Sequence, residues 1–339
     1  MAKIKVAING LGRIGRAFVK VAAEHPEIEL VAANDLGDIN NLAYLLKYDS
    51  AYGKSNLDIK VDGGNLVING QTIKFIQEKD PAKLPWGELA VDVVVESTGL
   101  FEDYSKAKAH LDAGARKVVI SAPAKGTPPE GVTGEMILMS VNDDKLSTCQ
   151  ISSNASCTTN CASPVVSILS ETIGIEKAML STIHAYTATQ KLVDSPDAKD
   201  WRRGRAGAAN IVPSTTGAAT ALAEVMPELK GKFDGIALRV PVITGSLTDI
   251  TFIAKRNTTV EEVNDILRKA AATERWNKIF LASDEELVSS DIINDPHASI
   301  ADLKFTKVVD GNLVKVLAWY DNEMGYTHTL VDHVIKTGS

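Results

Sequence analysis

The sequence predicts two successive architectures, an α/β half built on a parallel sheet and an α+β half with an antiparallel sheet. Over residues 1–150, short apolar runs alternate with segments of helical periodicity, as in successive βαβ units. The runs are apolar throughout, which is typical of parallel strands covered on both faces. Longer strand patterns and hairpin signals follow. A length of 339 residues also favours two domains.

The first half is expected to alternate strands and helices. Strands are predicted at 3–8, 29–33, 91–97 and 117–121, and helices at 13–23 and 103–113. A run at 148–152 is also strand-like. Asn69-Gly70 separates two strand-like arms and indicates a hairpin, because this pair suits the tight turns that join antiparallel strands.

The second half is expected to combine helices with long strands. Helices are predicted at 157–173, 217–226, from Thr259 and after Asn322, strands through Thr187 and over 236–255, and a hairpin over 304–319. The polar connection 188–210 is long for a compact domain, which often marks a functional loop. We expect one domain at 1–156, completed by the C-terminal helix at 321–339, and a second domain at 157–320.

Composition excludes several classes of protein. Hydrophobic residues make up 45% and charged residues 23% of the chain, as in soluble globular proteins. A net charge of −7 argues against nucleic-acid and anionic-membrane partners, which attract basic surfaces. Three cysteines do not make a disulfide framework, no metal site is indicated, and no apolar run reaches the ~18 residues of a membrane span. A cytoplasmic protein is expected.

A glycine-rich turn indicates a dinucleotide site. The motif Gly10-Leu-Gly-Arg-Ile-Gly15 follows a strand and opens a helix, and Asp35 ends the next strand. Such glycines let a pyrophosphate approach the helix N-terminus, and the carboxylate accepts hydrogen bonds from a ribose. This pattern predicts a Rossmann domain. Asp35 would repel a 2′-phosphate, so NAD is favoured over NADP, and Arg13 is a candidate diphosphate contact.

Cys157 is the candidate nucleophile. It lies between a strand-like run and a helix, where free N–H groups and the helix dipole stabilise a thiolate. The competing interpretation is that a free cysteine is a small buried hydrophobe, which is the interpretation given to Cys149. Cys161 lies on the same helical face as Cys157, a geometry that disfavours a bridge between them.

His184 is the candidate base, because it lies near the end of a strand that leads into the long loop. The other histidines are expected to be solvated, namely His25, His110, His297, His328 and His333. A cluster of hydroxyls and arginines in the same half predicts phosphate or carboxylate binding. Its members are Thr187, Arg203, Thr215, Thr216, Gly217 and Arg239.

Eight segments along the chain resemble the glyceraldehyde-3-phosphate dehydrogenase family. They are Asn9-Gly-Leu-Gly-Arg-Ile-Gly-Arg16, Leu45-Leu-Lys-Tyr-Asp-Ser50, Glu96-Ser-Thr-Gly99, Ser121-Ala-Pro-Ala-Lys125, Ala155-Ser-Cys-Thr-Thr-Asn-Cys161, His184-Ala-Tyr-Thr187, Arg239-Val-Pro241 and Trp319-Tyr-Asp-Asn-Glu323. The resemblance implies NAD-dependent oxidation of glyceraldehyde 3-phosphate to 1,3-bisphosphoglycerate in glycolysis or gluconeogenesis. Cys157 would form a hemithioacetal and then a thioester that inorganic phosphate cleaves, with His184 as acid and base.

The resemblance also implies binding residues, a homotetramer, and a catalytic and oligomerisation role for the domain at 157–320. Cofactor contacts would be Asn9, Gly10, Gly12, Arg13, Ile14, Asp35, Lys79, Ser121 and Asn322. The substrate phosphate would bind Thr187 and Arg239, and the attacking phosphate Ser156, Thr158, Thr216 and Gly217. Ser195-Pro196 replaces the Leu-Pro of many NAD-specific members, which leaves NADP use open, and segment 241–246 departs from the family's common loop.

Two other functions compete with this one. An erythrose-4-phosphate or other semialdehyde dehydrogenase would use the same thioester chemistry, because the motifs do not define the pocket's shape. A redox-sensing or nucleotide-bound interaction protein would use an exposed thiol only for oxidation. Comparing rates on the candidate aldehydes distinguishes the erythrose-4-phosphate or semialdehyde dehydrogenase from the leading function. Replacing Cys157 distinguishes the redox-sensing or interaction protein from it.

Overall fold

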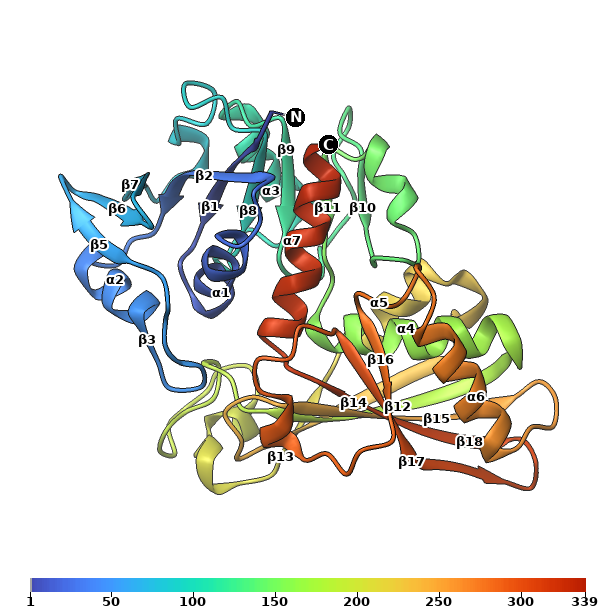
Figure 1. The fold of residues 1–339 in the computed structure, drawn as a ribbon. Coiled ribbons are helices and arrows are strands. Elements are labelled where there is room, and N and C mark those ends of the chain that lie inside the picture. The colour runs from blue at the N-terminus through green and yellow to red at the C-terminus, as the bar shows by residue number, and fades with distance from the viewer. Residues whose placement is uncertain (1) are drawn as a thin grey trace. The chain divides into compact units, whose positions relative to one another are not determined.

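The computed structural model describes residues 2–339, which separate into two compact units (Figure 1). The first unit runs to Ala155 and also contains Thr327–Ser339, and the second spans Ser156–Tyr326. The chain therefore leaves the first unit just before Cys157 and returns to it inside its last helix. In the described part of the chain, no helix has the length and apolar character needed to cross a membrane.

The first unit is built on a nine-stranded sheet in the order β10-β11-β9-β8-β1-β2-β7-β6-β5. Its strands are β1 Ile4–Asn9, β2 Ile28–Asn34, β5 Ile59–Asp62, β6 Asn65–Ile68, β7 Gln71–Ile76, β8 Val93–Glu96, β9 Lys117–Ile120, β10 Gly134–Met136 and β11 Ile151–Ser153. Pairing is parallel from β10 to β7, and the hairpin predicted at Asn69-Gly70 joins β6 to β7. The parallel sheet predicted from the unalternated runs is therefore confirmed.

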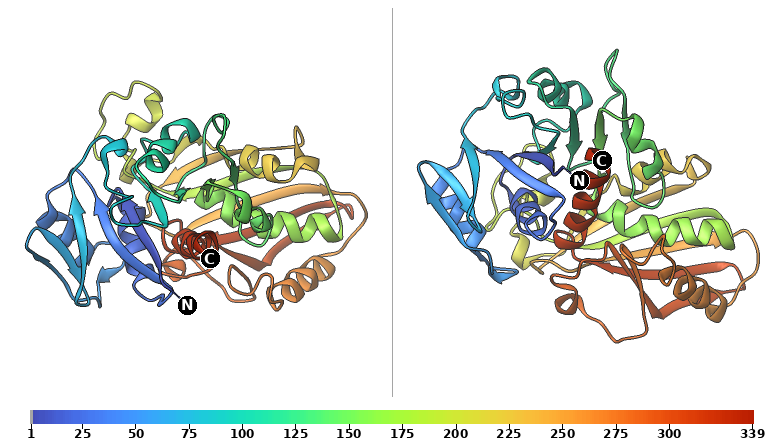
Figure 2. Two further views of the ribbon diagram at one scale, coloured as in Figure 1. Left: turned by 90° about the horizontal axis from the view of Figure 1, so that it is seen from above. Right: turned by 45° about the horizontal axis from the view of Figure 1, so that its top comes forward.

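The helices of this unit are α1 Arg13–Ala22, α2 Ile39–Lys47, α3 Tyr104–Asp112 and most of α7 Met324–Gly338 (Figures 1 and 2). Val93, Val94 and Val95 are 0% exposed, so β8 is covered on both faces. That burial explains why its sequence is apolar without alternation. A two-stranded ribbon of β3 Tyr48–Asp49 and β4 Gly53–Lys54 follows α2.

The second unit contains a seven-stranded sheet in the order β13-β14-β12-β15-β18-β17-β16. The strands are β12 Ile175–Ala185, β13 Val212–Thr215, β14 Phe233–Val240, β15 Ser246–Ala254, β16 Phe280–Ser283, β17 Ser299–Val309 and β18 Leu313–Tyr320. The helices α4 Cys157–Thr172, α5 Ala218–Val225 and α6 Val260–Ala271 pack against it (Figure 1).

This sheet is mainly antiparallel, as predicted, but it is not purely so. The pairs β12/β14 and β16/β17 are parallel. Parallel neighbours need a crossover of a dozen or more residues, and both connections are long enough: residues 186–232 contain α5, and residues 284–298 join the second pair. The parallel pair β12/β14 matters for the site, because it sets His184 beside Arg239.

Three local predictions are wrong. Residues 148–150 are not a strand, since a 3₁₀ turn at Asp143–Thr148 ends at Cys149. His110 and His333 are not solvated but 0% exposed. Polar partners compensate the burial: His110 contacts Glu96, and His333 contacts Ser152. Helical periodicity did not reveal these contacts, because they come from strands distant in sequence.

Candidate active site

Cys157 is the first residue of α4, and its side chain is half-buried. Ser156 caps the helix, because its Oγ accepts from Thr159 N at 3.1 Å. The rest of the helix is anchored by a run of buried residues from Thr158 to Leu169. A thiol is thus held at the N-terminal end of a fixed helix, as the sequence predicts. Cys149 and Cys161 are both buried and free.

His184 lies against this thiol from β12, with Nε2 at 3.4 Å from Cys157 Sγ. The contact is within the range of sulfur hydrogen bonds. Arg239 stands next to His184 across the parallel pair β12/β14, and its Nη1 is 2.5 Å from His184 Nδ1. Residues separated by 27 and 55 positions therefore meet because a helix start and two adjacent strands converge.

The electrostatics favour a neutral pair in this arrangement. Burial, and then the charge of Arg239, lower the pKa of His184 to about 3, against a smaller opposing effect of the Ala185 carbonyl. Burial also raises the pKa of Cys157, although Arg239 and hydrogen bonds from Thr158 lower it. Desolvation therefore opposes the thiolate that the helix start favours, and the charge of Arg239 and the hydrogen bonds at Thr158 act against that desolvation.

Two contacts compete for His184 Nδ1. It lies 2.7 Å from the Ala185 carbonyl oxygen, to which it can donate only when protonated, and 2.5 Å from Arg239 Nη1, from which it can accept only when unprotonated. In the tautomer protonated at Nδ1, Nε2 has a free lone pair facing Cys157, which is the form a general base requires. Arg239 can donate to the same carbonyl from 3.3 Å.

Two arginines give the second unit a cationic site. Arg203 donates to Ser214 Oγ from Nε at 3.0 Å and from Nη2 at 2.7 Å. Its charge is close enough to Arg239 to lower the pKa of that guanidinium, after the larger effect of burial. Within residues 2–339, the hydrogen bonds of the Arg239 side chain go to His184 and Ala185, and none goes to a carboxylate. Such a pair of half-buried cations suits a phosphate or carboxylate ligand.

The predicted hydroxyl ligands have different surroundings. Thr187 Oγ1 lies 2.9 Å from Thr189 Oγ1, and Thr216 Oγ1 accepts from Ala218 N at 3.2 Å. Gly217 caps α5 without a side chain, and a Cβ there would meet nothing within 4 Å. Thr158 is buried, and its hydroxyl lies 2.9 Å from the Tyr320 hydroxyl. The Thr158 side chain is therefore occupied inside the unit.

In the first unit, the glycine turn has the shape that a dinucleotide needs. Gly10 has a φ of 99°, and a Cβ there would lie 2.8 Å from Thr98 N, so only glycine fits. Gly12 caps α1 with no side-chain bond, and a Cβ there would meet nothing within 4 Å. Asp35 accepts from Leu11 N at 2.7 Å, which holds its carboxylate beside the turn. The residues present therefore fit NAD.

The remaining cofactor candidates differ in their exposure and in the partners they already have. Arg13 makes a two-point ion pair with Asp49, with Nη1 and Oδ2 2.6 Å apart, so its guanidinium is already engaged. Lys79 is exposed, and the side chains of Ile14 and Ser121 are half-buried. Asn9 is buried under the turn.

In the second unit, Asn322 is oriented by the atypical segment 241–246. Its Oδ1 accepts from Ser246 Oγ at 2.8 Å and from Thr244 Oγ1 at 3.3 Å. The amide NH₂ is then directed away from these hydroxyls. Sequence reasoning missed both hydroxyls, and the departure of this segment from the family pattern was the only signal.

Comparison with known proteins gives the family. The profile "Glyceraldehyde 3-phosphate dehydrogenase, NAD binding domain" matches residues 4–104, and the corresponding C-terminal domain profile matches residues 156–322. The glyceraldehyde-3-phosphate dehydrogenase of Mycolicibacterium smegmatis is 51% identical, covering 99% of this chain and 98% of that protein. The chain belongs to the glyceraldehyde-3-phosphate dehydrogenase family. Relatives from Geobacillus stearothermophilus and Bacillus subtilis are 50% and 48% identical, with at least 96% of each chain covered.

Membership of the glyceraldehyde-3-phosphate dehydrogenase family confirms the resemblance seen in the sequence. It makes the chain an NAD-dependent oxidoreductase that acts on an aldehyde. It also confirms the predicted fold class, a Rossmann NAD-binding domain followed by a second, catalytic domain. Sequence reasoning missed Tyr320, which lies 2.9 Å from both Thr158 Oγ1 and Thr182 Oγ1, because a strand aromatic resembles any core residue.

Proposed function

We propose that this chain converts glyceraldehyde 3-phosphate to 1,3-bisphosphoglycerate with NAD and inorganic phosphate, through an acyl group carried on Cys157. The observation that carries the proposal is the 3.4 Å contact between Cys157 Sγ and His184 Nε2, beside the Arg239 guanidinium. A thiol, a base and an anion site together suit attack on a phosphorylated aldehyde.

In the first step His184 takes the thiol proton on Nε2 as the sulfur attacks the aldehyde carbon. A C–S bond forms and the carbonyl electron pair moves onto oxygen. The Cys157 backbone N–H at the helix start and the protonated His184 stabilise this developing charge. His184 returns the proton to the oxygen, which gives the hemithioacetal.

In the second step His184 removes the hydroxyl proton from the hemithioacetal, which is oxidised to a thioester. NAD, when bound, supplies the acceptor for the hydride that leaves the carbon. The residues that would hold it are Asn9, Gly10, Gly12, Arg13, Ile14, Asp35, Lys79, Ser121 and Asn322. Asp35 favours NAD over NADP, and parallel assays with the two cofactors measure that preference.

In the third step an oxygen of inorganic phosphate attacks the thioester carbon, and the Cys157 thiolate leaves. Thr187 and Arg239 would bind the substrate phosphate, while Ser156, Thr216 and Gly217 would bind the attacking one. Thr158 would join them by exchanging its bond to Tyr320 for the phosphate. Arg203 contributes a second cation near Arg239. His184 then protonates the thiolate, which restores the starting pair.

The decisive assay follows NAD reduction by glyceraldehyde 3-phosphate with and without phosphate or arsenate. Turnover is expected only when one of these anions is present, and full-rate turnover without them would contradict the proposal. Erythrose 4-phosphate in the same assay serves as the competing aldehyde. A higher kcat/KM for erythrose 4-phosphate than for glyceraldehyde 3-phosphate would make erythrose 4-phosphate the proposed substrate.

Cys157→Ser should reduce this activity by at least about a thousandfold, because the hydroxyl is a far weaker nucleophile and carries no acyl group at comparable rate. NAD binding should be retained. Cys149→Ala is the matched control, because Cys149 is buried in the other unit and should be dispensable. Retained activity in Cys157→Ser would remove the thiol from the mechanism.

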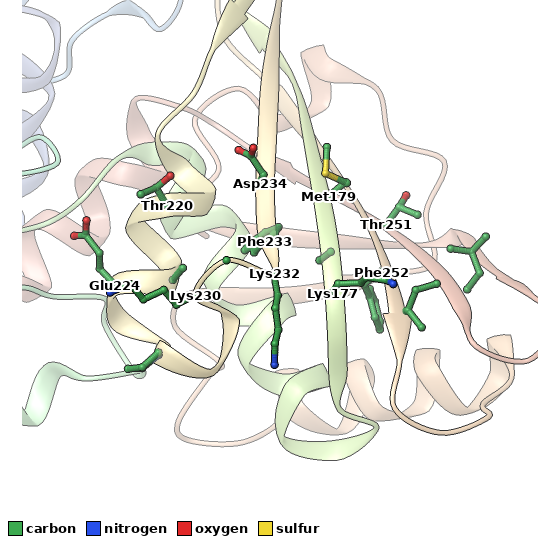
Figure 3. A pocket seen from close by; sticks show the side chains of 16 residues that line it. Lys177, Met179, Thr220, Glu224, Lys230, Lys232, Phe233, Asp234, Thr251 and Phe252 are labelled. Atoms are coloured by element: carbon green, nitrogen blue, oxygen red, sulfur yellow. The ribbon is translucent and has the colours of Figure 1, made fainter.

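Assembly as a cytoplasmic homotetramer is part of the same proposal. The face of the second unit's sheet opposite α4, α5 and α6 presents Met179, Ile236, Val309 and Leu313, which are 39–58% exposed. A hollow of about 980 Å³ opens beside it among α5, β12, β14 and β15, with Met179 and Phe233 on its wall (Figure 3). A second copy of the chain would cover this apolar surface. Light scattering tests the proposed homotetramer, and a monodisperse monomer would contradict it.

A further inference from the structure

A buried chain of polar side chains runs beneath the glycine turn of the first unit. It consists of Trp86, His110, Glu96, Asn9 and Asn34, each at most 5% exposed. Asn9, Asn34 and Glu96 are the last residues of β1, β2 and β8, which are neighbours at the centre of the sheet. A doubly wound sheet binds its dinucleotide at such strand ends.

Trp86 fixes the position of the proton on His110. The indole N–H can only donate, and it lies 3.0 Å from His110 Nδ1. Nδ1 is therefore an acceptor, and the proton of the neutral ring resides on Nε2. Nε2 lies 2.9 Å from Glu96 Oε2 and donates to it.

Glu96 transmits this bond to the nucleotide turn. Its Oε2 also accepts from Asn9 Nδ2 at 2.6 Å, and its Oε1 accepts from Thr98 N at 2.8 Å and from the Thr98 hydroxyl. The Thr98 backbone lies against Gly10, since a Cβ on Gly10 would be 2.8 Å from Thr98 N. Ser97 Oγ donates to the Gly10 carbonyl at 2.7 Å. The carboxylate thus holds both sides of the turn.

Asn9 extends the chain to the ribose-binding side. Its Oδ1 accepts from Asn34 Nδ2 at 2.7 Å. Asn34 precedes Asp35, whose Oδ2 accepts from Leu11 N at 2.7 Å. The glycine turn and the Asp35 carboxylate are therefore joined to His110 through the buried bonds among His110, Glu96, Asn9 and Asn34, the part-buried bonds at Thr98 and Leu11, and the Asn34–Asp35 peptide link.

We propose that His110 and Glu96 are positioning residues of the NAD site. His110 touches no part of the glycine turn itself. Its bond completes the set of donors on the buried Glu96 carboxylate, which is the group that aligns Asn9 and Thr98 under Gly10. A carboxylate that loses one donor in a dry interior draws the remaining donors out of position. The inference rests on the proposed NAD-dependent function, and it concerns affinity for NAD, not chemistry at Cys157.

The test is direct titration of the full chain with NAD. His110→Leu removes the donor to Glu96 and should weaken NAD binding about tenfold, the size of one charge-assisted hydrogen bond. His110→Gln keeps an amide donor at a similar distance, so its Kd for NAD should stay within about threefold of the value for the unaltered protein. In steady-state assays, KM for NAD should rise while kcat at saturating NAD and KM for the aldehyde stay constant.

His333→Asn is the matched control. His333 is equally buried in the same unit but bonds to Ser152 and Asn154, so its loss should lower stability without changing the Kd for NAD. Glu96→Gln serves as the second variant if His110→Leu fails to fold. The NH₂ of its amide is a donor and cannot accept the hydrogen bonds that Asn9 and His110 donate to Glu96. An unchanged Kd in a folded variant, or an equal loss in His333→Asn, would overturn the inference. Failure of the unaltered protein to bind NAD would instead overturn the proposed function.

Discussion

Burial and a third residue, Arg239, together influence the charge of the pair formed by Cys157 and His184. Burial and Arg239 both hold His184 neutral, and Arg239 at the same time stabilises a thiolate on Cys157. A substrate phosphate bound at Arg239 would neutralise part of that charge. His184 would then accept a proton more readily, while the Cys157 thiolate would lose part of its stabilisation, so substrate binding changes both members of the pair through one guanidinium.

Arg239→Gln should therefore raise the pKa of His184 above its value of about 3, because one of the two effects that lower it disappears. The pKa can be followed by NMR titration of the imidazole in the full chain. Arg203→Gln is the control, because Arg203 is not among the groups that act on His184. A His184 pKa that stays constant or falls in Arg239→Gln would contradict this account.

His333 should make the protein lose stability in acid. Burial lowers its pKa to about 3, whereas an unfolded histidine titrates near 6.5. As pH falls below about 6.5, the unfolded chain binds a proton that the folded chain refuses, so stability falls with pH until about pH 3.

His333→Asn should be less stable than the unaltered protein at pH 7, because it loses a ring that bonds to Ser152 and Asn154. The difference should narrow below pH 6.5, by up to about 1.4 kcal/mol for each pH unit. Denaturant unfolding at pH 7.5, 6.5, 5.5 and 4.5 measures it. A stability difference that is constant or widens toward low pH would contradict the prediction.

The connections between secondary-structure elements place the chemistry. β1 and α1 are joined by a turn that contains Gly10 and Gly12, and a side chain is excluded at each position by a different cause. At Gly10 the backbone conformation and the nearby Thr98 backbone exclude any side chain. At Gly12 the surroundings are open and φ is an ordinary −67°, so the constraint must come from the ligand.

Gly12→Ala should therefore leave the melting temperature nearly unchanged but weaken NAD binding at least about tenfold, because a methyl group would enter the pyrophosphate space. Gly10→Ala should weaken both, since its Cβ would lie 2.8 Å from Thr98 N. Thermal unfolding and NAD titration of the two variants separate these effects. Normal NAD affinity in Gly12→Ala would show that the pyrophosphate does not approach this position.

At the level of the complete molecule, the open face of the second sheet is the feature that a single chain leaves unexplained. Met179 is 57% exposed and Ile236 is 49% exposed, and they lie on the neighbouring strands β12 and β14. Water contact with such a face costs free energy that association with a second copy recovers.

Met179→Lys with Ile236→Lys should shift the assembly toward smaller species, because lysine at both positions places charge inside the proposed contact. Light scattering at several concentrations measures the mass. Val288→Lys is the control, an equally exposed apolar side chain outside that sheet. An unchanged mass in the double variant would place the subunit contact elsewhere.

Local patterns are enough to predict the individual helices, strands and turns and to identify the reactive groups. The glycine turn, Asp35 and the Cys157 helix start follow from turn sterics, strand ends and helix capping, which act within a few residues. The hairpin at Asn69-Gly70 is predictable for the same reason.

The effects of these groups on one another depend on contacts that form only when the chain is folded. The parallel register of β12 with β14 brings Arg239 to His184, and burial then makes the Cys157 pair neutral. The same holds for His110, which periodicity places on an exposed helix and packing places against Glu96. Side-chain charge and proton position depend on the dielectric and on partners far away in sequence, and neither is a property of a local pattern.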